Sequence, residues 1–325
     1  MFYSGMAETL PAQVRAAAAV VAQHADHVTI DADRLHRYVE ELPIGSLCHP
    51  VLEPAALPEG NAATIAQWVV TVNAVNFGSG FFPVLQKRPG LSGSRTVFAA
   101  LLDRFNGEGP LSVDELQSAT AAGCSELFGQ QADGPAQELM EWFATAWQSL
   151  GHALAERWDR SALHLVEAAS GRAAELATLL ATIDGWDDVA NHLGHAVPLY
   201  KRAQIVPAHL AMAFSGVDHG HFDDLGDLTI FADNLVPHVL RIDGVLRFDS
   251  DLVERIDRGE LLEPGSPEEV EIRAVAVHAA ELLVTRLRDD GHPATAMGLD
   301  QVLWERGGEP RYKAHPRHRA RTTAY

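Results

Sequence analysis

Apolar residues recur at helical spacing along most of this chain. Ile65, Trp68 and Val72 follow a repeat of about 3.6 residues, and Asn61 is placed to cap the helix that contains them. Similar signals predict helices over residues 11–23, 31–39, 95–105, 112–121, 135–158, 161–169, 171–183, 200–214, 231–240, 250–258 and 266–288. The pattern therefore predicts a mainly α protein.

Capping residues mark the clearest helix starts. Ser112 and Glu115 have the spacing of a capping box. Ser266, Pro267 and Glu269 combine an N-cap, a proline at the first helical position and a residue that closes the box. Only residues 245–248, after an Asp-Gly turn, read as a strand. We expect residues 1–325 to form a single compact multi-helix body with at most a small β element, and a subdivision is possible near residue 190.

Residues 77–94 interrupt the helical pattern. This stretch, FGSGFFPVLQKRPGLSGS, is rich in Gly, Pro and aromatic residues. A loop that carries large apolar side chains is often a binding surface. We therefore predict that this loop contributes to a ligand site.

Composition and charge narrow the class of protein. Of the 325 residues, 47% are hydrophobic and 21% are charged, which suits a globular core. The formal net charge of −19 argues against binding intact nucleic acid, although a small phosphorylated ligand needs only a local basic pocket. Two cysteines imply no disulfide framework, and neither a signal peptide nor a membrane span is evident. We expect a cytoplasmic protein away from membranes and leave its oligomeric state open.

Adjacent cations lie in the segment LYKRAQIVPAHL, residues 199–210. On a helix, Lys201 and Arg202 point about 100° apart, so they cannot both face one ligand in the same way. Lys201 is a usable point charge for a phosphate or a carboxylate. The alternative is a solvated pair at a helix start.

A single carboxylate lies in the apolar segment LTIFADNLVPHVL, residues 228–240. Asp233 must there be paired or be held for function, because a bare buried charge is costly. The alternative interpretation makes Asp233 a helix cap that starts the turn containing Pro237. The pattern alone does not decide between these two roles.

The only basic cluster is the tail HPRHRARTTAY, residues 315–325. Its side chains suit an anion such as phosphate, and the alternative is a disordered charged tail. Two histidine pairs, at 192 and 195 and at 219 and 221, match no metal signature. No glycine-rich nucleotide loop or G-x-S-x-G motif is present. We therefore expect neither a metal nor another cofactor.

Five blocks in order resemble the queuosine-salvage family. They are VNAVNFGSGFFP at 72–83, YKRAQI at 200–205, TIFADNLVPHVL at 229–240, EVEIRA at 269–274, and HRAR at 318–321 with Tyr325. The resemblance runs through almost the whole chain. It implies a helical body similar to DNA-glycosylase-like folds. It also implies an N-glycosyl hydrolase that converts queuosine 5′-phosphate to queuine, for salvage into tRNA modification, and ribose 5-phosphate.

The resemblance also implies roles for individual residues. Asp233 stabilises positive charge on the ribose or attacks it, and we infer that Lys201 keeps this carboxylate ionised or orients it. Phe231 and Phe77 are expected to stack on the base. The further expected substrate-binding residues are His49, Asn73, Asn76, Glu305, Arg306, Glu309, His318, Arg319, Arg321 and Tyr325. Of these, His318, Arg319 and Arg321 are expected to hold the phosphate, with Lys201 as a competing candidate.

Departures from the family pattern leave two alternatives open. The family usually has Asp where this chain has Asn73. It often reads Leu-Trp-Asp-Tyr with a further acid, where this chain has Glu305, Arg306 and Glu309. The two glutamates are expected to accept hydrogen bonds from the amino and ring N–H groups of queuine, a 7-deazaguanine. The alternatives are a non-catalytic deazapurine-nucleotide-binding protein and a nucleosidase for another nucleoside or nucleotide.

Overall fold

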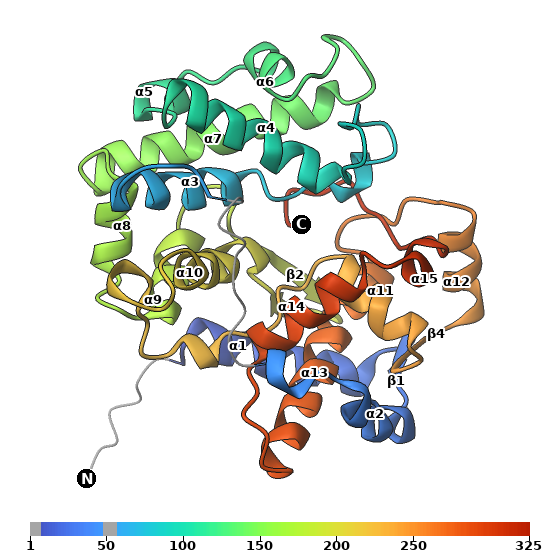
Figure 1. Cartoon of the computed structure of the whole chain (residues 1–325). Coiled ribbons are helices and arrows are strands. Elements are labelled where there is room, and N and C mark those ends of the chain that lie inside the picture. Colours follow the sequence, from blue (N-terminus) through green and yellow to red (C-terminus); the bar gives the residue numbers. More distant parts are fainter. Residues whose placement is uncertain (1–7, 48–56) are drawn as a thin grey trace.

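The computed structural model describes residues 8–47 and 57–325, and helices dominate it (Figure 1). The helices are α1 (Leu10–His24), α2 (Ala32–Tyr38), α3 (Ala62–Ala74), α4 (Gly93–Glu108), α5 (Val113–Gln117), α6 (Ala121–Leu127), α7 (Gln137–Arg157), α8 (Ala162–Ala168), α9 (Ala173–Ala181), α10 (Lys201–Ala213), α11 (Leu235–Ile242), α12 (Ser250–Asp257), α13 (Pro267–Asp289), α14 (Ala296–Arg306) and α15 (Pro310–Lys313). The prediction of a mainly α fold is confirmed.

Two antiparallel pairs of short strands complete the described structure. β1 (Val28–Ile30) pairs with β4 (Leu246–Phe248), and β4 coincides with the predicted strand. β2 (Val189–His192) and β3 (His195–Pro198) form a hairpin that the sequence did not predict. Its turn residues Leu193 and Gly194 both have positive φ, 52° and 83°, as tight hairpin turns require. The hairpin precedes α10 directly and sets where that helix begins.

Helix caps bear out most of the predicted starts. The side chain of Asn61 accepts a hydrogen bond from the Thr64 amide at α3, and both halves of the Ser112–Glu115 box are present at α5. At α13, Ser266 caps the helix, but Glu269 does not close the box. Its carboxylate accepts from the Gly265 amide at 3.1 Å. That part of the prediction is wrong because Glu269 is buried and lies 3.6 Å from a buried arginine.

Helix α14 was not predicted, although it lies in the interior against α11 and α13. Thr295 caps it by accepting from the Gly298 amide. Position 298 has no room for a residue larger than glycine, since a Cβ there would lie 1.8 Å from the Leu47 carbonyl oxygen. The same helix carries the buried polar residue Asp300.

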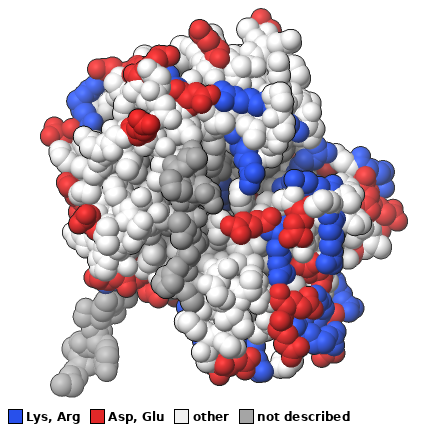
Figure 2. All heavy atoms as spheres, viewed as in Figure 1, with Lys and Arg blue, Asp and Glu red and all other residues white. Residues whose placement is uncertain are grey.

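The long helix α13 runs through the lower half of the molecule, packed against α1, α11 and α14 (Figure 1). Helices α3 to α8 form the upper half, and the C-terminal segment lies between the halves. Within the described residues, no helix is long and apolar enough to cross a membrane. In the space-filling view the face between the halves is hollowed, with acidic and basic side chains at its edge (Figure 2).

Candidate active site

Asp233 lies two residues before the first residue of α11, and its side chain caps that helix. Its Oδ1 accepts hydrogen bonds from the amides of Leu235 at 2.7 Å and Val236 at 3.1 Å. The side chain is partly exposed, and no other group of the described chain donates to it. The two interpretations of Asp233 are therefore compatible: one oxygen caps the helix and the other is available to a ligand.

Lys201 is the first residue of α10, and it is buried with 5% exposure. Its Nζ donates to the Asn76 carbonyl at 2.8 Å, which leaves two of its three N–H groups for other partners. Burial lowers the pKa of Lys201 to about 8, although the charge of Asp233 raises it. Lys201 and Asp233 therefore interact across the site.

The neighbouring cation points elsewhere, as helical geometry predicts. Arg202 donates to the Ala74 carbonyl at 2.8 Å and to the Gly185 carbonyl. Its guanidinium lies 5.0 Å from the ring centroids of both Phe77 and Trp186. Arg202 therefore organises the core, and Lys201 alone of this pair faces Asp233.

A second carboxyl group, Asp300 of α14, joins Asp233 and Lys201. It is 7% exposed, and its Oδ1 accepts from the Phe231 amide at 2.8 Å. Burial raises the pKa of Asp300 well above its ordinary value, and the negative charge of Asp233 raises it further. The sequence analysis missed Asp300, although an acid within an apolar run was the same signal that drew attention to Asp233.

A buried ion network supports the segment that carries Asp233. Arg273 of α13 donates to both carboxylate oxygens of Asp188, at 2.6 and 3.0 Å, and through Nε to the Ala232 carbonyl at 2.9 Å. Asp188 in turn accepts from the Lys201 amide at 3.1 Å. The EVEIRA block therefore positions the Asp233 segment and the start of α10 together.

A second link joins the same two blocks. The Gln204 side chain donates to the Thr229 hydroxyl at 2.9 Å and accepts from the Thr229 amide at 3.1 Å. Both residues have zero exposure. YKRAQI and TIFADN are therefore held together by buried hydrogen bonds, which fixes Lys201 relative to Asp233.

The tail is ordered and packed, which contradicts the alternative of a disordered segment. Arg319 donates to the Gly259 carbonyl at 3.0 Å, and Arg321 donates to Glu138 at 2.9 Å. His318 is buried, and its carbonyl accepts from the Asn234 side chain at 3.2 Å. The polar atoms of Arg319 and Arg321 are thus directed to protein partners.

Tyr325 is an anchor of this tail. Its ring lies 4.6 Å below the guanidinium of Arg273, and its carbonyl accepts from the Gly78 amide at 2.9 Å. Glycine at position 80 lets the tail pass closely, since a Cβ there would meet the Ala320 oxygen at 2.3 Å. The tail therefore links the loop after α3 to α13.

Arg317 differs from the other arginines of the tail in its contacts. It is partly exposed and makes no hydrogen bond or ion pair with any residue in the described ranges. Burial lowers its pKa, and the charge of Asp233 opposes this. Arg317 therefore lies within electrostatic reach of Asp233, a placement that no sequence signal distinguished from its basic neighbours.

The remaining expected site residues divide between two regions. Asn73 and Asn76 lie beside Lys201 and are bonded to each other at 3.0 Å. Phe231 is buried beside Asp300, and Phe77 packs edge-on against Phe143 at 5.2 Å. His49 lies outside the described residues.

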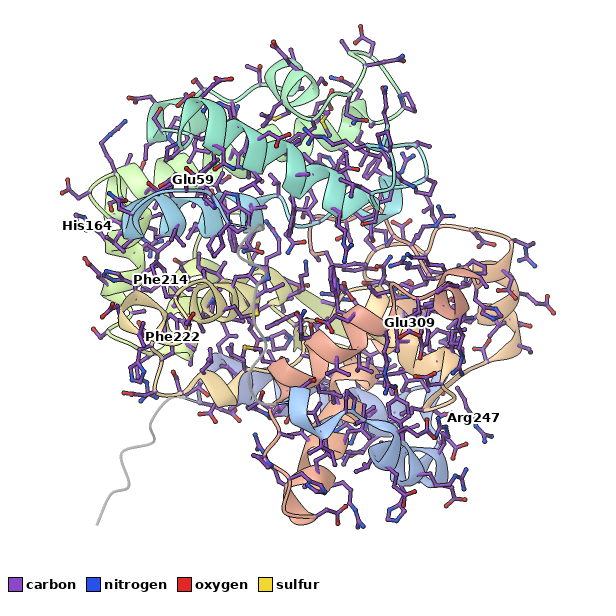
Figure 3. All side chains as sticks on the ribbon, in the orientation of Figure 1. Glu59, His164, Phe214, Phe222, Arg247 and Glu309 are labelled. Carbon is purple, nitrogen blue, oxygen red and sulfur yellow. The ribbon has the colours of Figure 1, made fainter. Side chains whose placement is uncertain are left out.

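The acids expected at the base lie at the end of α14 and the start of α15. Arg306 donates to the Tyr38 hydroxyl at 2.9 Å and to the Glu41 carbonyl at 2.6 Å. Glu305 and Glu309 are exposed, with Glu309 at the start of α15 (Figure 3). In the described part of the chain, no hydrogen bond or ion pair joins these three residues to Asp233 or Lys201, so their role at the base stays a prediction.

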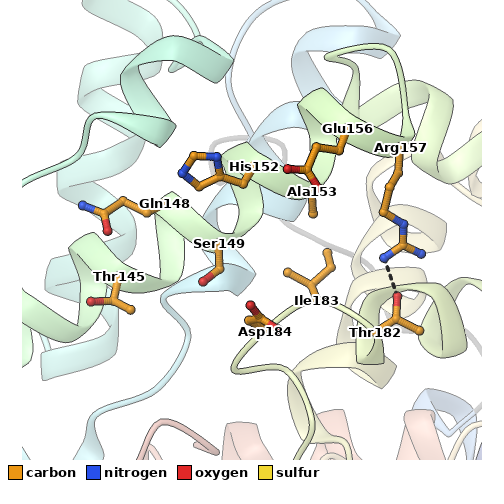
Figure 4. A pocket seen from close by; sticks show the side chains of 10 residues that line it. All are labelled: Thr145, Gln148, Ser149, His152, Ala153, Glu156, Arg157, Thr182, Ile183 and Asp184. Carbon is orange, nitrogen blue, oxygen red and sulfur yellow. Dashed lines mark hydrogen bonds between the residues drawn. The ribbon is translucent and has the colours of Figure 1, made fainter.

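The described structure also has a surface hollow of about 390 Å³ (Figure 4). It is lined by Thr145, Gln148, Ser149, His152, Ala153, Glu156, Arg157, Thr182, Ile183 and Asp184. None of these residues contributes to the cluster around Asp233. The described residues also contain no group of three or more His, Cys, Asp or Glu side chains that could hold a metal ion.

Comparison with known proteins decides the family. The family model described as queuosine salvage protein matches residues 56–325. The chain belongs to the queuosine salvage protein family. A protein of Sphaerobacter thermophilus named queuosine 5′-phosphate N-glycosylase/hydrolase is 33% identical over 94% of this chain and 95% of its own length. The mouse protein of the same name is 26% identical over 97% of this chain and 99% of its own length.

Proposed function

We propose that this protein hydrolyses the N-glycosidic bond of queuosine 5′-phosphate and releases queuine and ribose 5-phosphate. The observation that carries the proposal is the state of Asp233, whose Oδ1 is fixed by two backbone amides while its other oxygen remains available beside Lys201. Membership of the queuosine salvage family supports the choice of substrate. The substrate is a small molecule, and the net charge of −19 disfavours intact nucleic acid.

Asp233 acts on the sugar in this proposal. Breaking the N-glycosidic bond develops positive charge on the ribose, and a fixed carboxylate beside the anomeric carbon stabilises it. The free oxygen either does this electrostatically or attacks to form a covalent intermediate that water then hydrolyses. Because Oδ1 is held by the backbone of α11, the free oxygen needs little reorganisation in the transition state.

Asp300 takes a different role because its environment differs. The carboxyl group is buried and lies near the charge of Asp233, so it keeps its proton where an ordinary aspartate would lose it. A carboxyl group that keeps its proton can donate a hydrogen bond. We assign the charged role to Asp233 and hydrogen-bond donation to Asp300.

The phosphate requires a cation that the protein has not already paired. Arg319 and Arg321 are bonded to Gly259 and Glu138, whereas Arg317 has no such partner in the described chain. An arginine fork suits a phosphate group. We therefore propose Arg317 as the phosphate ligand, with Lys201 as the competing candidate.

A side-by-side assay tests the proposal. Queuosine 5′-phosphate, queuosine and ordinary purine nucleotides are incubated with the protein, and release of the free base is measured. We expect queuine from the 5′-phosphate and a loss of at least about 1,000-fold in kcat for Asp233→Asn. Normal turnover by Asp233→Asn contradicts its assignment.

The two alternatives have their own signatures in that assay. Tight binding of the nucleotide without product on long incubation indicates a binding protein. Faster release from another nucleoside or nucleotide indicates a different substrate. Either result overturns the proposed function.

A further inference from the structure

His209 lies two helical turns after Lys201 on α10, and the mechanism above does not use it. Its ring is partly exposed, and its Nε2 makes no hydrogen bond to any described residue. Its Nδ1 lies 3.0 Å from the Asn73 side-chain nitrogen. A partly buried ring with one bonded and one unbonded nitrogen can present that second nitrogen to a ligand.

The surroundings of Asn73 fix the direction of this hydrogen bond. Asn73 has zero exposure, and its Nδ2 donates to the Val69 carbonyl at 2.8 Å. A carbonyl only accepts, so the amide nitrogen must face it. The Asn73 Oδ1 is occupied on its other side by the Asn76 amide at 3.0 Å. The second N–H of Asn73 therefore donates to His209 Nδ1, and that nitrogen must be unprotonated.

The proton of the neutral ring then resides on Nε2. Burial, together with the positive charge of Lys201, lowers the pKa of His209 to about 3, so the ring is neutral near pH 7. A neutral imidazole has one donor nitrogen and one acceptor nitrogen, and the bond to one sets the other. His209 is thus a fixed, uncharged N–H donor.

A chain of hydrogen bonds connects His209 to the site. Lys201 Nζ donates to the Asn76 carbonyl at 2.8 Å, the Asn76 side chain donates to Asn73 Oδ1 at 3.0 Å, and Asn73 donates to His209 at 3.0 Å. In the proposed function, Arg317 and Asp233 bind the phosphate and the ribose. The base then extends toward the Asn73 side of Lys201, where His209 lies.

We propose that His209 donates a hydrogen bond from Nε2 to an acceptor atom of the departing base, and that Asn73 is the positioning residue that fixes this tautomer. The proposal rests on the proposed function. The base gains negative charge as the glycosidic bond breaks. A hydrogen bond donated to the base therefore becomes stronger in the transition state. A 7-deazaguanine lacks the ring nitrogen usually protonated in purine release, which makes donors to its other acceptors more important.

The pairing with His209 depends on an amide rather than a carboxylate at position 73. An aspartate there would accept a proton from His209 Nδ1 rather than donate to it, and it would face the Val69 carbonyl unfavourably. Nε2 would then become an acceptor. Asn73 and His209 thus form a matched pair in this chain.

Nitrogen NMR of protein labelled in histidine tests the tautomer without any assay of activity. We expect the His209 resonances of the protonated Nε2 and unprotonated Nδ1 form, assigned by their loss in His209→Phe. Asn73→Asp should convert them to the Nδ1-protonated or charged form. Asn191→Asp is the matched control, since a carboxylate still accepts the Gly194 amide in the hairpin turn. An Nδ1-protonated ring in the wild type, or an unchanged tautomer in Asn73→Asp, overturns the proposal.

Kinetics test the contact with the base. His209→Phe should lower kcat for queuosine 5′-phosphate by about 100-fold with little change in KM, because the donor acts mainly in the transition state. His164→Gln, at an exposed site, is the control and should be unaffected. Normal kcat in a folded His209→Phe protein overturns the proposal. An inactive wild type instead overturns the proposed function, whatever the tautomer.

Discussion

Arg273 and Asp188 form a bidentate pair at 2.6 and 3.0 Å, with 2% and 7% of their side chains exposed. The pair connects α13 to the start of α10, and Arg273 also bonds the Ala232 carbonyl. Removing one partner would leave the other charge buried and unpaired. The pair therefore helps to fix the backbone positions of Lys201 and of the segment that carries Asp233.

Stability measurements test the contribution of the Arg273–Asp188 pair. We expect Arg273→Met to lower the free energy of unfolding by about 3–5 kcal/mol, because Asp188 is left buried without its partner. Arg286→Gln removes an exposed pair with Asp290 and should cost less than about 1 kcal/mol. Denaturant unfolding compares the two. Equal effects would contradict the importance of the buried pair.

The pH dependence of turnover tests Lys201. Burial lowers its pKa to about 8, so its positive charge is present below that pH and is lost as the pH rises through it. We expect kcat/KM for queuosine 5′-phosphate to fall on the alkaline side with an apparent pKa near this value. Lys201→Arg should remove the fall, since arginine stays charged.

The control for this profile is Lys87→Met, which changes an exposed lysine. Its alkaline limb should match the wild type. An alkaline limb that persists unchanged in an active Lys201→Arg variant would show that another group titrates.

Stability as a function of pH tests the protonated state of Asp300. Its folded pKa lies above its unfolded value, so the folded state holds more protons between the two values. The stability contributed by the protonated group is complete below the unfolded pKa and is lost as the pH rises through the folded pKa.

Asp300→Asn isolates that contribution, because an amide imitates the uncharged acid. We expect the variant to lose less stability than the wild type as the pH rises, and to retain more activity than Asp300→Ala. Unfolding free energies at several pH values measure the first, and initial rates measure the second. Parallel stability curves for Asp300→Asn and the wild type would contradict a protonated Asp300.

Comparing nucleotide with nucleoside tests the phosphate ligand. Arg317→Gln should lower kcat/KM for queuosine 5′-phosphate by about 10- to 100-fold and leave slow turnover of queuosine little changed, because only the phosphate contact is removed. Arg319→Gln and Arg321→Gln are matched controls from the same tail. A larger phosphate-specific loss in either control would return the assignment to that residue.

The sequence predicted the fold class and several motifs that meet in the structure, and the reason is local. Periodicity and capping depend on neighbouring residues, so α3 and α5 began where their caps predicted. Asp233 and Lys201 carried recognisable blocks around them. Asp300 did not, because its contact with Phe231 joins residues 69 positions apart.

Long-range pairing also explains where the predicted base ligands lie. Arg306 is the last residue of α14, and Tyr38 and Glu41 meet it from α2 and the turn after it, which no local pattern reveals. His209 likewise reads as one polar residue in an apolar helix until Asn73 is placed beside it. A sequence shows which polar residues lie within apolar segments. Their hydrogen-bond partners can be identified only in the folded structure.

The cap at Asp233 has a consequence for the side chain that this position can hold. Two backbone amides of α11 donate to one oxygen of Asp233. Because aspartate has a single methylene group, these bonds also fix the distance of the other oxygen from the helix. A glutamate carries the same charge but one more carbon, and it cannot meet both amides and keep its free oxygen in place. The backbone of α11 therefore selects the length of the side chain at position 233 as well as its charge.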